Sequence, residues 1–135
     1  MEILFSESTG EIDLSADRAT LSHLADLLAR GSGSMSADPA PNPPLGQTPL
    51  THLSVQSVDG EPVVVVADTE SHSLSIAGDS AFLKIFADNV QAIAEIDDGG
   101  HLHIDFYPDH PYLGEGSAPL VVNSPHGETP KARTL

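Results

Sequence analysis

The residues best suited to chemistry lie together near the C-terminal end, in the segment HLHIDFYPDHPYL that begins at His101. Its His101, His103 and Asp105 are spaced two apart, so on a β-strand they would share one face, with neighbours about 7 Å apart. Two imidazoles and a carboxylate can bind zinc or non-haem iron, and Asp109 and His110 could add ligands from the following loop. The same pattern is also typical of the solvated face of a half-buried strand, or of a face that contacts a partner.

The sequence lacks the short motifs that mark common active sites. It has no cysteine, which excludes disulfides, thiolate metal ligands and cysteine nucleophiles. GxSxG, HExxH, the Walker A loop and the EF-hand pattern are also missing. The neighbouring acids Asp97 and Asp98 could bind a cation, but a turn that ends a helix explains them as well. We therefore expect a protein that is not an enzyme and carries no cofactor.

The net charge restricts the kind of partner. The chain has 20 Asp and Glu residues against 5 Lys and Arg residues, a formal net charge of -15 over 135 residues. Such a field repels nucleic acid phosphates and anionic membrane surfaces and attracts basic proteins. We expect neither nucleic acid nor membrane as a partner. Solubility, adaptation to salt or the amino-acid usage of a GC-rich genome would also account for the charge.

Length and apolar patterning predict one domain over residues 1–123, followed by a disordered tail over 124–135. Residues 31–50 are rich in Gly, Ser and Pro and are predicted to be a flexible loop within that domain. No apolar run is long enough to span a membrane, and the first residues are not a secretory signal. These features predict a cytoplasmic protein.

Two helices are predicted from apolar residues at helical spacing. The first has Ser15 as its N-cap and Gly31 as its stop, with the stripe Leu21, Leu24, Leu27 and Leu28. The second has Asp79 as its N-cap and ends near residues 97–100. Its apolar positions are Phe82, Ile85, Phe86, Val90 and Ile93.

Several segments alternate or concentrate apolar residues in the manner of strands, at 2–6, 11–14, 51–58, 61–67, 71–77, 101–107 and 118–123. Asp59-Gly60 predicts a hairpin turn, and the β-branched segment after it predicts a central strand. On the 101–107 strand, Leu102, Ile104 and Phe106 should face inward. The order of elements predicts an α+β fold, with one mostly antiparallel sheet and two helices packed on one face.

Three segments together resemble a known family: EILFSES, LSIAGDSAFLKIFADNV and HLHIDFYPDHPYLGEGSAPLVVN. They are similar to the immunity protein 32 family of bacterial polymorphic toxin systems. The resemblance implies a protein that binds a cognate secreted toxin domain directly and neutralises it in the producing cell. A basic nuclease is one candidate for that toxin, since its charge would complement this chain.

Under this hypothesis the contact surface is acidic and rich in His and Tyr. We expect it to comprise Asp105, Tyr107, Asp109, His110 and Tyr112, with His101 and His103 behind them. Two alternatives remain open at this point. One is a small metal-binding protein or metal-dependent enzyme that uses His101, His103 and Asp105. The other is a non-catalytic domain that forms oligomers through an exposed sheet edge, since the sequence does not fix the oligomeric state.

Overall fold

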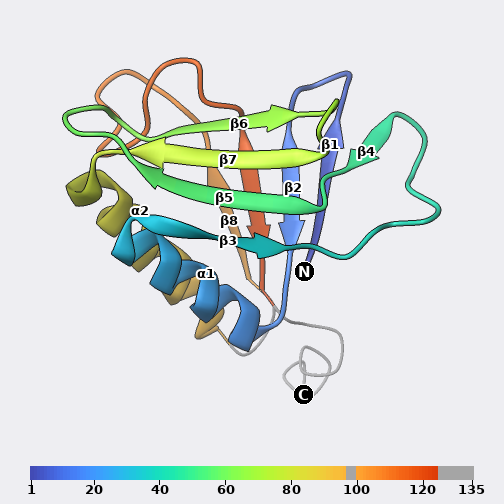
Figure 1. The fold of residues 1–135 in the computed structure, drawn as a ribbon, viewed down its shortest axis with the longest axis horizontal. Helices are drawn as coiled ribbons and strands as arrows, with labels where there is room; N and C mark the ends of the chain where they lie inside the picture. Colours follow the sequence, from blue (N-terminus) through green and yellow to red (C-terminus); the bar gives the residue numbers. More distant parts are fainter. Residues whose placement is uncertain (97–99, 125–135) are drawn as a thin grey trace.

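The fold is known from a computed structural model, which describes residues 1–96 and 100–124 (Figure 1). These residues form two helices, α1 (Arg18–Arg30) and α2 (Ser80–Ala94). They also form the strands β1 (Glu2–Ser6), β2 (Ile12–Ser15), β3 (Ser32–Ser36), β4 (Gln47–Pro49), β5 (His52–Ser57), β6 (Val64–Asp68), β7 (Ser73–Gly78), β8 (His101–Ile104) and β9 (Leu120–Asn123). The α+β class predicted from the sequence is confirmed.

The strands form two sheets, so the prediction of a single sheet is wrong. One sheet has the strand order β4-β1-β2-β9-β8, and the other has the order β3-β5-β7-β6. Each contains one parallel pair, β2 with β9 and β5 with β7, among antiparallel pairs. A parallel pair needs a long crossover connection, and here β6 provides the return between β5 and β7. The single-sheet prediction was wrong because it assumed that each strand pairs with the next one along the chain.

One continuous core joins the two sheets and the helix pair. Ile3 and Leu14 from the five-stranded sheet are fully buried in it, together with Leu53 and Leu74 from the four-stranded sheet. The strands of the two sheets cross in Figure 1, and the helices lie together at one side of them. Helix α1 packs on α2 and β3, while α2 also contacts β7, β8 and β9. Both helices therefore contribute to closing the core between the sheets.

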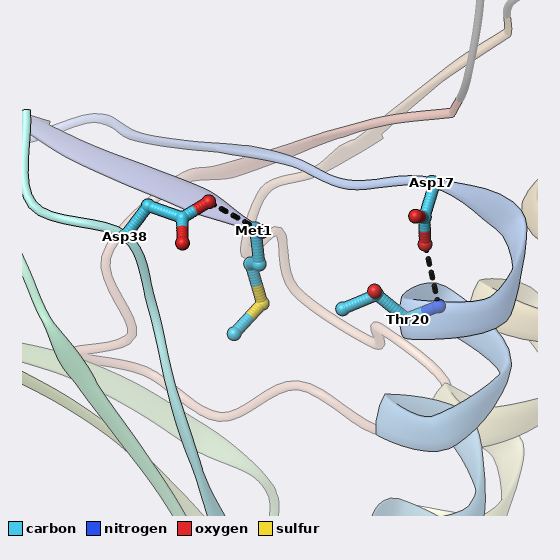
Figure 2. Close-up of polar contacts among 4 residues, drawn as sticks. All are labelled: Met1, Asp17, Thr20 and Asp38. Atoms are coloured by element: carbon cyan, nitrogen blue, oxygen red, sulfur yellow. Dashed lines mark hydrogen bonds and ion pairs between the residues drawn. The ribbon is translucent and has the colours of Figure 1, made fainter.

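The start of helix α1 differs from the prediction by two residues. Asp17, not Ser15, is the N-cap, because its side chain accepts a hydrogen bond from the Thr20 amide at 2.8 Å (Figure 2). Ser15 ends strand β2 instead. The predicted stop at Gly31 is confirmed by its left-handed backbone, with φ of 80°. The predicted N-cap of α2, Asp79, is also confirmed and accepts from the Ala81 amide.

The segment predicted as a loop over 31–50 contains two strands, β3 and β4, so that prediction is wrong for these residues. Strand β3 lies at the edge of its sheet. Its pairing with the backbone of β5 holds it there, although it has few apolar side chains. Gly33 is needed there, since a Cβ atom would lie 2.6 Å from a methyl carbon of Leu27. After β3, the chain is held at Asp38, whose carboxylate pairs with the Met1 ammonium group at 3.1 Å (Figure 2).

The hairpin predicted at Asp59-Gly60 does not form, because β7 lies between β5 and β6. The Gly60 amide donates to the Asp79 carboxylate at 2.8 Å, which ties this turn to the start of α2. The segment after it is an edge strand and not a central one, and Val66 is exposed. Residues 112–118 follow that edge: the Val63 amide donates to the Tyr112 carbonyl, and the Gly114 amide donates to the Val63 carbonyl.

Two further details differ from the predicted elements. In α2, Ile85 is 39% exposed, while Leu83 and Ala87 take the buried positions. Ser124, predicted as the first tail residue, is buried, and its hydroxyl accepts from the Gly100 amide at 2.6 Å. The pair Asp97 and Asp98 and the remaining predicted tail, 125–135, lie outside the described residues.

Candidate partner-binding site

A hollow of about 360 Å³ lies where strand β8, helix α2 and the loop after β8 meet. Its lining residues are Asn89, Leu102, His103, Asp105, Tyr107, His110, Pro111 and Tyr112. Five of the seven residues predicted to contact a partner are therefore brought together here. The other two, His101 and Asp109, are not among the lining residues.

The predicted strand over 101–107 is shorter than expected and ends at Ile104. Asp105 and Tyr107 therefore belong to a loop, and their placement on one strand face with His101 and His103 is wrong. Pro108 favours this end because proline cannot donate to a strand ladder. Phe106 was expected to face inward but is 38% exposed. Because the loop leaves the sheet here, its side chains can line a hollow.

The loop turns back at Tyr107 and His110. The His110 amide donates to the Tyr107 carbonyl at 3.0 Å, and Asp109 between them has a left-handed backbone with φ of 68°. Aspartate adopts this conformation more readily than most residues. The turn brings the rings of Tyr107 and His110 to a centroid distance of 4.7 Å. It thus places two aromatic side chains next to each other at the hollow.

His110 is held in one tautomer by the backbone. Its Nδ1 atom accepts hydrogen bonds from the Tyr112 amide at 3.2 Å and the Leu113 amide at 3.0 Å. An accepting Nδ1 places the ring proton on Nε2 in the neutral imidazole. Burial lowers the pKa of His110 below its ordinary value of 6.5. The ring is therefore neutral at pH 7 and can donate from Nε2.

Tyr112 connects the hollow to the core. Its ring stacks on Phe86 of α2 at a centroid distance of 5.4 Å and meets the edge of His110 at 4.6 Å. Its hydroxyl accepts from the Asn89 Nδ2 group at 3.2 Å. Burial raises the pKa of Tyr112, and its side chain is only 4% exposed. Tyr112 thus forms the floor of the hollow, while Tyr107, which is 52% exposed, stands at its rim.

His101 belongs to a separate polar network on the five-stranded sheet. Its Nδ1 group lies 2.5 Å from the Asn123 Oδ1 atom, and the Asn123 Nδ2 group donates to Asp13 and Ser15. The His101 and His103 rings are 6.4 Å apart, so the two residues are neighbours with different surroundings. This network holds His101 against the sheet.

Sequence reasoning missed two polar residues that the fold makes important. Asn89 comes from α2 and reaches the hollow, and Asn123 links three strands. A polar residue at the end of the apolar segment LVVN was a signal for Asn123. Asn89 had no such signal, because its role depends on how α2 packs beside the loop.

The metal hypothesis gains no support from this geometry. Across residues 1–96 and 100–124, no group of three or more His, Asp or Glu side chains could hold a metal ion. In the same residues no helix is long and apolar enough to cross a membrane.

The residues around the hollow lie in a segment that matches a known protein family. Residues 73–125 match the family model of immunity protein 32. This segment is similar to the immunity protein 32 family. The resemblance predicted from the sequence is thus confirmed over residues 73–125, while the segment EILFSES lies outside the match. The comparisons with curated proteins and with solved structures found no match.

The immunity protein 32 segment contains the whole hollow. It includes β7, α2, β8 and β9, and each residue that lines the hollow has a number between 89 and 112. The N-terminal half supplies most of the four-stranded sheet and helix α1, and α1 packs against α2. The part of the chain that carries the family match is therefore also the part that builds the candidate site.

Proposed function

We propose that this protein is an immunity protein that binds a cognate secreted bacterial toxin and neutralises it without catalysing a reaction. The observation that carries this proposal is the immunity protein 32 match, which spans the hollow and its loop. The proposed place of action is the cytoplasm of the cell that makes the toxin. There, direct binding would block the toxin before it is secreted.

The net charge supports a basic partner. The chain has 20 acidic residues and only 5 Lys and Arg residues. One of these, Arg18, donates to the Ala94 and Glu95 carbonyls at the end of α2, so its charge stabilises a helix end. A strongly negative protein attracts a basic one over long range and associates faster at low salt. A basic nuclease domain fits this chemistry.

The proposed contact surface is the set predicted from the sequence, now ordered by exposure. Asp105, Tyr107 and Asp109 are exposed on the loop, and His103 is exposed on β8. His110 and Tyr112 lie deeper and shape the surface from below. His101 is exposed at the start of β8 and does not line the hollow. Exposed aromatic and charged side chains around a hollow are typical of binding hot spots.

A survival assay tests the function. The toxin domain encoded beside this gene is expressed in a bacterial host with and without this protein, and the complex is isolated by co-purification. Rescue of growth together with a stable complex is the expected result. Absence of both would overturn the proposed function.

A pair of charge reversals tests the location of the contact surface. Asp105→Lys with Asp109→Lys should weaken toxin binding much more than Asp26→Lys with Glu70→Lys. All four carboxylates are exposed. Each double variant replaces two carboxylates with two ammonium groups, so both variants change the net charge by the same amount. Asp26 lies on α1 and Glu70 in the turn before β7, away from the hollow. Equal loss of binding would place the contact elsewhere or make it a general effect of charge.

A further inference from the structure

We propose that the hollow binds the guanidinium group of an arginine side chain of the toxin. This inference rests on the proposed function and specifies the chemistry of its contact. The juxtaposition that carries it is a carboxylate and an amide beside three aromatic rings in one hollow of about 360 Å³. Pockets that take small groups are of this size or larger, and a polar rim gives them specificity.

The side chains that line the hollow provide hydrogen-bond acceptors for a cation. Among the described residues, they bring no cationic Lys or Arg side chain that would compete with it. Asp105 brings a carboxylate. Asn89 donates to Tyr112 through Nδ2, so its Oδ1 atom is the accepting end of the amide. A guanidinium group has five donors in a planar fork, which suits two or more acceptors at different positions.

Aromatic rings supply the second part of the recognition. Tyr107, His110 and Tyr112 follow one another with centroid distances of 4.7 and 4.6 Å. Cations are attracted to the faces of such rings, and arginine also stacks on them through its planar group. His110 does not oppose a cation at pH 7, because its Nδ1 atom accepts two backbone hydrogen bonds and burial lowers its pKa.

Two large apolar side chains are partly exposed next to lining residues in the chain or on helix α2. Ile85 precedes Asn89 by one turn of α2 and is 39% exposed, and Phe106 is exposed on the loop. Large apolar side chains around a polar contact exclude water from it, which strengthens the electrostatic attraction within. The toxin residue is therefore expected to be an arginine in an otherwise apolar patch.

The first experiment examines the hollow without the toxin. NMR titration of the full chain uses N-acetyl-arginine amide, its neutral citrulline analogue and N-acetyl-lysine amide as probes. We expect saturable shifts around Asn89, Asp105 and Tyr107 with the arginine probe, about tenfold weaker binding of the citrulline and lysine probes, and about tenfold weaker arginine binding by Asp105→Asn. The variant Asp26→Asn removes one exposed carboxylate from α1 and should bind as the wild type does. Equal binding of the three probes, or no shifts at these residues, would overturn the inference.

The second experiment separates this inference from the proposed function. Toxin affinity is measured for the wild type, Asp105→Asn, Tyr107→Leu and Asp26→Asn, with thermal unfolding to show that each variant folds. Loss of about tenfold in affinity for Asp105→Asn and Tyr107→Leu alone is the expected result. A wild type that binds and rescues, with both hollow variants unchanged, would reject the arginine contact and keep the proposed function. A wild type that does not bind the toxin would reject both.

Discussion

The hydroxyl of Tyr112 accepts a hydrogen bond from Asn89 at 3.2 Å, and this contact joins helix α2 to the loop that forms the hollow. Tyr112 comes 23 residues after Asn89 and also stacks on Phe86, one turn earlier in the same helix. The carbonyl of Tyr112 receives the Val63 amide at 2.8 Å. One residue thus fixes the loop to both the helix and the edge of the four-stranded sheet.

Replacing Tyr112 should separate these roles. Tyr112→Phe removes only the hydroxyl and is expected to cost about 1 kcal/mol of unfolding free energy. Tyr112→Ala also removes the ring from the stack with Phe86 and is expected to cost about 3–5 kcal/mol. Urea unfolding of the two variants and the wild type measures both values. If Tyr112→Ala proved as stable as the wild type, the ring would not contribute to the core as the structure indicates.

A second prediction concerns pH and His110. The pKa of His110 is lowered in the folded protein, so the unfolded chain binds this proton more readily. The unfolding free energy should therefore be fully maintained above pH 6.5 and decrease as the pH falls from 6.5 through the lowered pKa. His110→Asn should remove this part of the pH dependence, since asparagine can still accept the backbone amides but does not titrate.

The measurement is urea unfolding at several pH values between 5 and 8. His23→Asn is the control, because His23 is exposed on α1, away from the hollow. A loss of pH dependence that His23→Asn shared with His110→Asn would not be specific to His110. A wild type whose stability did not change across this range would contradict the role assigned to the burial of His110.

The parts of the fold that could be predicted from the sequence are those with local signals. Both helices follow from apolar spacing, and Asp79 and Gly31 mark ends by their own backbone and side-chain preferences. Strands β1 and β2 follow from the short apolar segments at 2–6 and 11–14, and they pair with each other in antiparallel fashion. Ser15 was a good N-cap candidate by type, but pairing of β2 with β9 extends the strand through it.

The arrangement into two sheets depends on contacts between distant parts of the chain. Strand β2 pairs with β9 through partners such as Leu14 and Val122, which no local pattern links. Strand β3 has almost no apolar residues and exists because β5 offers it a backbone edge. The same distinction holds at the site. Five predicted residues line the hollow together because one short segment contains them. Asn89 comes from a helix whose position relative to that segment could not be predicted from the sequence.

A third prediction tests the cap of helix α1. Asp17→Ala should cost about 1 kcal/mol, because the Thr20 amide loses its acceptor. Asp17→Asn should preserve most of the stability, since asparagine caps helices about as well. The hydrogen bond from Thr20 also lowers the pKa of Asp17, so the stability it provides is present above pH 3.8 and is lost as the pH falls further. Urea unfolding of the two variants at pH 7 and pH 3 measures these effects, and equal stability of Asp17→Ala and the wild type would reject the cap.

The final prediction concerns the network around Asn123. This residue is buried, and its amide group contacts Asp13 and Ser15 on β2 and His101 on β8. Asn123→Ala leaves those polar partners without their shared contact and should cost about 1–3 kcal/mol, measured by urea unfolding. Toxin affinity should change much less than in Asp105→Asn, because Asn123 does not line the hollow. A variant that kept full stability but lost toxin binding would instead place the contact surface at His101, on the sheet rather than at the hollow.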